Sequence, residues 1–492
     1  MLLLFFFINF NYTVLRDTKD ALIVTAPGSG AEAITFLKVW GVVPVAALFM
    51  ILYAKLSNTL SKTSLFYATV IPFVIFFGLF AFVFYPMRDM LHPHGLADQL
   101  QALLPKGFSG LIAIFRNWTF SLFYIMAELW GTFGISVLFW TFANDITKVG
   151  EAKRFYALFG IGANIAMVLS GPLIMKMSKI QEFVPAGVDP WGVSLKYLMT
   201  LVVVAGLCTI GIYWWINKYV LTDARFYNTA ELKAAKKEKP KMSLKESFLY
   251  LTRSKYLGCI ALLVIAYGIS INLVEVTWKS QLKLQYPNPN DYNHFMGLFS
   301  TIVGPVTIFM MLFVSRNIIQ RFGWGVAAQI TPVVLLITGV GFFSFVIFRD
   351  VLTGFIAALH TTPLMLAVIF GMAQNIASKS SKYSLFDPTK EMTYIPLDQE
   401  SKIKGKAAID GVGGRMGKSG GALIQQGLIL CCGSIAAITP YVAGILFFII
   451  FVWIFAAKSL SKQFANLTAE KEKSKETIDV KDAVLKNSEQ QA

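Results

Sequence analysis

Charged side chains are scarce in this chain. Only 15% of its 492 residues are Asp, Glu, Lys or Arg, while 55% are hydrophobic; an average soluble domain is about 25% charged. Such a composition argues against a soluble globular protein, which must cover its surface with polar groups. The apolar residues also recur in blocks of about twenty, the length of a helix that crosses a ~30 Å hydrocarbon core. The sequence therefore predicts an all-α polytopic membrane protein.

Cysteine and histidine are rare as well, with four of each. The cysteines lie in or at the edges of apolar segments, and their spacing fits neither a zinc site nor a disulfide framework. We therefore expect no metal and no cofactor. The four cysteines are Cys208, Cys259, Cys431 and Cys432.

Twelve segments are long and apolar enough to be predicted as membrane spans. The first opens with MLLLFFFINF, which lacks the basic leader and the cleavage site of a signal peptide. We therefore interpret it as the first part of a spanning helix. The predicted limits are 1–25, 33–56, 63–85, 112–142, 154–176, 196–221, 256–285, 293–317, 324–348, 353–378, 405–432 and 436–460.

The net charge of +16 indicates membrane topology here, and we expect no nucleic-acid partner. Lys and Arg concentrate in the loops after even-numbered spans, which the positive-inside rule places in the cytoplasm together with both termini. A basic loop, 222–255, separates a six-helix half, 1–221, from a second half, 256–462, and a flexible tail, 463–492, follows. Two six-helix halves predict a major-facilitator-like fold with the substrate between them at the midplane.

Charges inside predicted spans mark the candidate site, because a charge at the centre of a spanning helix costs about 2.5–3.5 kcal/mol. In the first span Arg16 and Lys19 share one face and predict a cationic cavity wall. The alternative is that both are hydrated at the outer end of the helix. Glu128 in the fourth span has apolar residues on both sides; its alternative role is a structural ion pair.

The seventh span contributes Asn272 and Glu275. Glu275 is four residues before Lys279, so a simple pair along the helix is the alternative to a role in substrate binding. Together with the cations of the first span, these groups predict a cavity for an anion that carries more charge than one carboxylate.

The eleventh span, AAIDGVGGRMGKSGGALIQQ, holds Asp410, Arg415 and Lys418 among glycines. Arginine and lysine are suitable donors for a polyanion; the alternative is a packing helix whose cations reach the cytoplasm. The string GGRMGKSGG is not a P-loop, because that motif needs glycine where Val412 stands and a preceding strand. A membrane-bound ATP-hydrolysing enzyme is therefore disfavoured.

Several segments resemble the ATP/ADP translocase family of plastids and obligate intracellular bacteria. They are LRDTKDALIVTAPGSGAEAITFLKVW, AELWG, FWTFANDITKVGEAKRFYALFGIGANIA, NLVEVTWK and SLFDPTKEMTYIPLDQESKIKGKAAIDGVGGRMGKSGG. The resemblance covers nearly the whole membrane domain. It implies that the chain is a transporter that exchanges ATP for ADP, and it places functional charges at Lys19, Glu128, Glu275 and Lys418.

On this basis we expect Lys19 and Lys418 to hold the phosphates from opposite halves, with Arg16 and Arg415 as further candidates. Glu128 and Glu275 would hold the lysines in the empty state or set the selectivity between ATP and ADP. Unpaired cations that face each other across an empty cavity would repel and slow the empty carrier. An aromatic or apolar pocket for adenine is expected, and the sequence does not choose one.

The expected substrates are ATP and ADP, with phosphate as a further candidate, and the expected surroundings are a lipid bilayer. We predict a functional monomer in a bacterial inner membrane that imports host ATP; the plastid inner envelope is the alternative location. A proton-coupled importer of several nucleotides in the same family is the alternative function, since two carboxylates lie in the predicted cavity.

Overall fold

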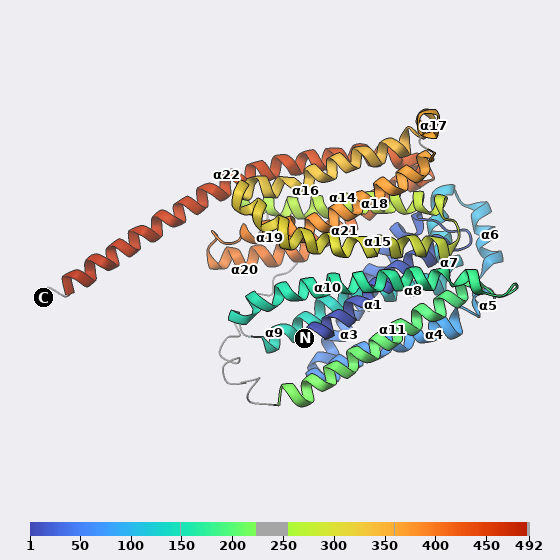
Figure 1. Cartoon of the computed structure of the whole chain (residues 1–492), viewed down its shortest axis with the longest axis horizontal. Coiled ribbons are helices and arrows are strands. Elements are labelled where there is room, and N and C mark those ends of the chain that lie inside the picture. The colour runs from blue at the N-terminus through green and yellow to red at the C-terminus, as the bar shows by residue number, and fades with distance from the viewer. Residues whose placement is uncertain (148, 223–253, 359, 490–492) are drawn as a thin grey trace.

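The computed structural model describes residues 1–147, 149–222, 254–358 and 360–489. The predicted basic loop, 222–255, therefore lies almost entirely outside the described residues. In the described part the chain is helical throughout, and most helices lie side by side along one direction (Figure 1). The first helices, blue to green, form one layer of the molecule, and the later ones, yellow to red, form the other.

The first half is built from long helices joined by short ones. Several long helices continue through wider π-helical turns without a break in direction. The label η marks these turns and also two short 3₁₀ helices, η3 and η5. The elements are α1 (Leu2–Val24), α2 (Glu32–Phe36), η1 (Leu37–Val42), α3 (Val43–Thr59), α4 (Lys62–Leu79), η2 (Phe80–Phe84), α5 (Arg88–Leu91), α6 (His94–Leu103), η3 (Lys106–Phe108), α7 (Ser109–Arg116), α8 (Trp118–Leu129), η4 (Trp130–Phe139), α9 (Trp140–Ile146), α10 (Val149–Ser178), η5 (Lys179–Phe183), α11 (Pro190–Trp215) and η6 (Ile216–Val220).

The second half has the same construction. Its elements are α14 (Lys255–Gln285), α15 (Pro289–Phe309), η7 (Met310–Val314), α16 (Ser315–Ile347), α17 (Arg349–Ala357), α18 (Pro363–Ser381), η8 (Lys382–Phe386), α19 (Asp387–Met392), α20 (Gln399–Ala408), η9 (Ile409–Gly413), α21 (Gly414–Cys432) and α22 (Ile435–Glu489).

Eight helical stretches in the described residues are long and apolar enough to cross a membrane. One of them, Pro289–Ile347, contains two predicted spans, and its helix breaks at Gly323, where φ is 77°. The helices α1, α18 and α21 are not among the eight. The membrane-spanning architecture is confirmed, and the number of twelve spans stays a prediction.

Two predicted limits are wrong. The segment 353–378 is not one helix, because α17 ends at Ala357 and α18 begins at Pro363, with Thr362 capping its first turn. The segment 112–142 is interrupted at Asn117, whose backbone is not helical. At the end of the chain α22 continues to Glu489, into the predicted tail 463–492, whose flexibility stays a prediction.

The two halves meet along α10 and α15, which lie against each other in Figure 1. Near the end of the bundle that carries α6 and α17, Gln181 donates to Asp291 at 2.9 Å and Asn293 donates to Ser178 at 3.0 Å. Lys283 of α14 donates to the backbone oxygen of Ser29. These contacts hold the halves together at that end.

The α14 and α21 backbones come close at Gly268 and Gly417. A Cβ added at Gly417 would lie 3.0 Å from the Gly268 Cα atom, so neither position has room for a side chain. Glycine at such crossings lets spanning helices approach closely. This contact fixes α21 against the helix that carries Glu275.

Candidate functional site

The predicted charges of the first span lie deep inside the protein. Asp17, Lys19 and Asp20 are 0%, 3% and 1% exposed, within a stretch of α1 that is almost entirely buried. The alternative that Lys19 is simply hydrated at a helix end is therefore wrong in this structure. Buried charges of this kind require partners, because an unpaired ion in a low-dielectric interior is very costly.

Lys19 has two carboxylate partners. Its Nζ atom lies 2.8 Å from Asp20 Oδ1 and 3.0 Å from Glu128 Oε1, and it sits 3.9 Å from the centre of the Tyr124 ring. Tyr124 and Glu128 are one turn apart on α8, so both face Lys19. Two predicted site residues, Lys19 and Glu128, are thus brought into direct contact within the first half.

Asp20 connects this group to the other half. Its second oxygen, Oδ2, lies 2.7 Å from Lys279 Nζ, and Lys279 in turn lies 2.8 Å from Glu275 Oε1. The pair between Glu275 and Lys279 that the sequence offered as an alternative is present. It is one link of a longer chain, because the same lysine also binds a carboxylate of α1.

Lys38 of η1 makes a second connection between the halves. Its Nζ atom lies 2.6 Å from Asn272 Oδ1, to which it donates, and 3.5 Å from Glu275 Oε2. Asn272, a predicted site residue, also donates to the Gly268 backbone oxygen at 3.0 Å. Its side chain is thereby oriented toward Lys38.

Arg16 makes the third connection. It lies 2.9 Å from Asp17 and donates to Ser300 Oγ of α15 at 2.7 Å, while Ser300 donates to Asp17 at 2.5 Å. Next to Ser300, Phe299 holds Lys379 of α18, whose Nζ is 4.7 Å from the ring centre. The cationic wall of α1 is therefore built against the second half.

These contacts define one structure, which we call the central charge cluster. Its four cations are balanced by four carboxylates, so the cluster is neutral as a whole. Its members are Arg16, Asp17, Lys19, Asp20, Lys38, Glu128, Glu275 and Lys279. The expectation that unpaired cations face one another is thus wrong for Lys19, which two carboxylates neutralise.

The predicted residues of the eleventh span are in a different situation. Arg415 and Lys418 are exposed, and neither side chain forms an ion pair with any residue that the structure describes. Asp410 is 2.8 Å from Lys390 of α19 and is not in contact with the central charge cluster. Lys418 follows Gly417, the residue of α21 that packs on α14. Its side chain leaves the helix about 200° around the axis from that of Met416, so the two side chains point to nearly opposite sides of α21.

Sequence reasoning missed Lys38 and Lys379 as site residues and left Asp20 and Lys279 out of the candidate set. Lys38 lies inside the predicted span 33–56, so the rule applied to Lys19 would have found it. Lys379 was assigned to a loop because the predicted span ended at 378, whereas α18 continues to Ser381. Among the described residues, no group of three or more His, Cys, Asp and Glu side chains is placed to hold a metal ion.

Comparison with solved structures supports the fold. A bacterial homologue of the iron transporter ferroportin, in an inward-facing state, superposes with a TM-score of 0.58 over 92% of this chain and 97% of its own, at 13% identity. The likeness at this identity concerns architecture alone. It agrees with the predicted major-facilitator-like class.

Comparison with known sequences gives the family. Residues 1–464 match the model of the TLC ATP/ADP transporter family. ADP,ATP carrier protein 1 of Chlamydia muridarum is 62% identical over 96% of this chain and 89% of its own length. The chloroplastic ADP,ATP carrier protein 1 of Arabidopsis thaliana is 56% identical over 96% and 75%, and ADP,ATP carrier protein 1 of Rickettsia bellii is 44% identical over 96% and 94%. The chain belongs to the TLC ATP/ADP transporter family.

Proposed function

We propose that this protein exchanges ATP for ADP across a membrane by alternating access. The observation that carries the proposal is the central charge cluster, which joins α1 and η1 of one half to α14 and α15 of the other through ion pairs and hydrogen bonds. Relatives at 44–62% identity that carry the name ADP,ATP carrier support the substrate assignment.

The phosphates would bind between Lys19 and Lys418. Lys19 is 3% exposed, whereas its partner Glu128 is 33% exposed. An incoming polyphosphate would therefore displace Glu128 from Lys19 and take over its charge. Lys418 is exposed and needs to break no ion pair with a described residue. Arg16 and Arg415 are further candidates for the phosphates, and Asn272 would position Lys38 near them.

The ion pairs between the halves explain why the inward movement of one nucleotide would require the outward movement of another. Separation of the halves at Asp20 and Lys279, which are 1% and 2% exposed, would leave Asp20 with Lys19 alone and Lys279 with Glu275 alone. Each buried charge thereby loses one of its two counter-charges, which costs free energy in the empty carrier. A bound nucleotide phosphate would compensate the lysines during this rearrangement, so the loaded carrier would change sides faster than the empty one.

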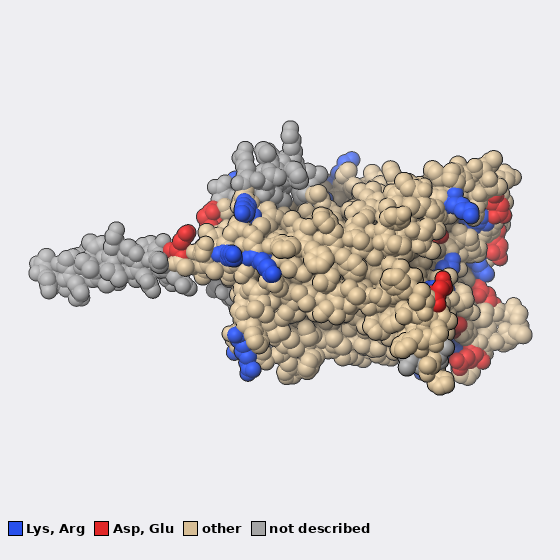
Figure 2. All heavy atoms as spheres, turned by 90° about the horizontal axis from the view of Figure 1, so that it is seen from above, with Lys and Arg blue, Asp and Glu red and all other residues tan. Residues whose placement is uncertain are grey.

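Both termini are proposed to be cytoplasmic. Figure 2 shows mainly Lys and Arg side chains at the end from which α22 projects and both signs at the opposite end, where most of the Asp and Glu side chains gather. A belt of uncharged residues lies between the two ends. This distribution agrees with the positive-inside rule. We further propose a bacterial inner membrane as the location, import of host ATP as the direction, and a monomer as the working unit.

Exchange in proteoliposomes tests the function. Vesicles loaded with ADP should take up labelled ATP, and empty vesicles should take up little. Rapid uptake into empty vesicles under a pH gradient would instead support the proton-coupled importer of several nucleotides. A panel of unlabelled nucleotides and phosphate inside the vesicles would show which of them serve as counter-substrates.

A further inference from the structure

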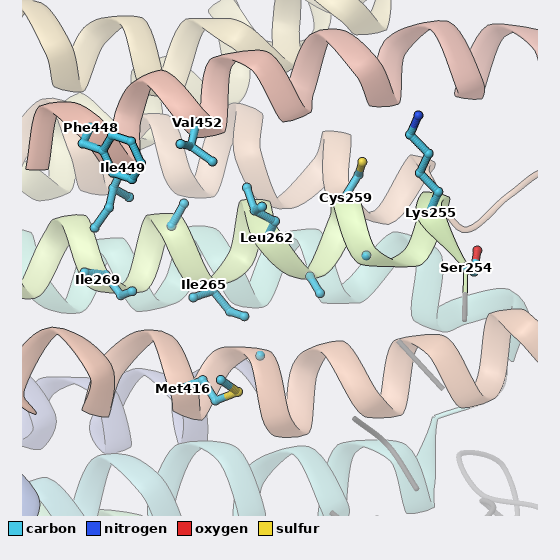
Figure 3. Close-up of a pocket in the computed structure, with 14 residues that line it drawn as sticks. Ser254, Lys255, Cys259, Leu262, Ile265, Ile269, Met416, Phe448, Ile449 and Val452 are labelled. Carbon is cyan, nitrogen blue, oxygen red and sulfur yellow. The ribbon is translucent and has the colours of Figure 1, made fainter. Parts of the chain in front are cut away.

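An apolar groove runs along the first part of α14, before the residues that α14 contributes to the central charge cluster. Its volume is about 620 Å³, and no member of the cluster lines it. α14 forms one wall, and α21 and α22 form the others, as Figure 3 shows. The lining residues are Ser254, Lys255, Gly258, Cys259, Ala261, Leu262, Ile265, Ala266, Ile269, Gly413, Met416, Phe448, Ile449 and Val452.

The groove is open to the lipid phase. Phe448 is 69% exposed and Met416 is 44% exposed, and both belong to helices of the membrane domain. Along α14 the lining runs from Ser254 to Ile269, a rise of about 22 Å. That length exceeds the ~15 Å that one leaflet contributes to a ~30 Å hydrocarbon core. The groove is therefore long enough for the acyl chain of one lipid.

One end of this groove is charged. Lys255 lies at the first residue of α14, at one end of the row of side chains in Figure 3, while Ile269 and Phe448 lie at the other end. Lys255 is exposed and forms no ion pair with a described residue. Its position places an ammonium group where the phosphate of a lipid headgroup would lie if the acyl chain filled the groove.

We propose that this groove binds an anionic glycerophospholipid, with one acyl chain along Leu262, Ile265 and Met416 and the headgroup phosphate at Lys255. Apolar side chains line the groove over the length of one leaflet and the cation stands at its membrane-surface end, a pattern that fits no water-soluble nucleotide. The bound chain would press on Met416 of α21 and support the helix that carries Lys418. This site is separate from nucleotide exchange and would exist even if the exchanged nucleotides were others.

Native mass spectrometry of the purified full-length protein tests the site. With phosphatidylglycerol or phosphatidylcholine added to the detergent, the wild type should retain one phosphatidylglycerol under conditions that remove phosphatidylcholine. The charge reversal Lys255→Glu should weaken phosphatidylglycerol retention by about tenfold and abolish the preference. Leu262→Trp should fill the groove and prevent retention.

Two matched variants serve as controls. Lys55→Glu changes an exposed lysine near the end of α3, and Leu207→Trp changes a side chain of α11 that is 56% exposed; neither lines the groove. Both should retain phosphatidylglycerol as the wild type does. Equal retention of the two lipids by the wild type, or unchanged retention in Leu262→Trp, would overturn the proposal.

Cys259 offers a measurement that needs no substitution in the groove wall. With Cys208, Cys431 and Cys432 replaced by serine, the rate of Cys259 alkylation by a small maleimide reports whether the groove is occupied. Added phosphatidylglycerol should slow the reaction severalfold, whereas phosphatidylcholine should not. Identical rates in the two lipids would contradict the proposal even if Leu262→Trp failed to fold.

Discussion

Two sets of cations in this protein stand in opposite surroundings. Lys19 on α1 is 3% exposed and touches two carboxylates, whereas Arg415 and Lys418 on α21 are exposed and pair with no described residue. Lys19 is part of the architecture, because its removal leaves the buried Asp20 with Lys279 alone and Glu128 without its lysine. The second set is free to meet an anion. The comparison separates a cation that must be freed from its carboxylate partners before it can bind the substrate from cations that are available to the substrate at once.

The largest effect is expected from Lys19→Met. This change leaves Asp20 with Lys279 alone and Glu128 without its lysine, so both stability and exchange should fall. The loss in unfolding free energy should be about 1–3 kcal/mol, because Asp20 keeps one lysine and Glu128 is 33% exposed. Thermal unfolding in detergent measures it. An unchanged unfolding temperature would show that Lys19 is no more structural than Lys418.

Lys418→Ala should abolish most of the exchange while membrane insertion and unfolding temperature stay normal. Loss of one charged hydrogen bond of about 1.5–3 kcal/mol corresponds to a decrease of about 10–100-fold. Initial rates of ATP uptake into ADP-loaded proteoliposomes measure it, with Lys418→Arg as the variant that keeps the charge. Wild-type rates in Lys418→Ala would remove this lysine from the site.

Glu275→Gln should change the preference between ATP and ADP. The carboxylate is 22% exposed and is shared by Lys279 and Lys38, so its neutralisation leaves more positive charge for the phosphates. For a partly exposed pair the expected change is modest, about two- to fivefold. Competition of the two nucleotides for uptake measures the ratio. An unchanged ratio would favour a purely structural pair with Lys279.

The smallest effect is expected from Lys38→Ala. Its loss frees Asn272 and removes one of the three connections that the central charge cluster makes between the halves. The apparent affinity for nucleotide should therefore fall by about twofold. Lys55→Ala on α3 is the control, since Lys55 is exposed and outside the cluster. The concentration dependence of uptake gives the apparent nucleotide affinity of each variant. Equal affinities of the two variants would show that Lys38 does not contribute to nucleotide binding.

Most of the architecture was predictable because hydrophobic blocks report directly on spanning helices. The error at 353–378 arose because the apolar run GFIAAL, 354–359, lies only a few residues before the apolar residues that follow Pro363, so hydropathy did not reveal the turn. The pair Thr362–Pro363 was the signal, since threonine caps a helix and proline favours its first position. The free-energy cost of placing a charge inside a spanning helix pointed to Lys19, Glu128 and Glu275, and the structure places all three as buried or partly buried groups.

The pairing of these charges could not be predicted from the sequence. Spacing along one helix indicated the contact between Glu275 and Lys279, four residues apart, and that contact is present. The contact of Asp20 with Lys279 joins residues more than 250 positions apart and depends on how the halves pack. Local patterns carry no information on such a distance, so the neutral balance of the cluster became visible only in three dimensions.

The contact between Gly268 and Gly417 has a consequence for how this carrier can move. Because the two backbones touch where neither residue has a side chain, sliding one helix along the other would bring larger residues into the contact. We therefore expect α14 and α21 to move as one unit. Glu275 and Lys418 would then keep their mutual distance while both change position relative to α1. Any larger residue at Gly268 or Gly417 would push α14 and α21 apart. These two positions should therefore tolerate substitution as poorly as the charged residues of the central charge cluster.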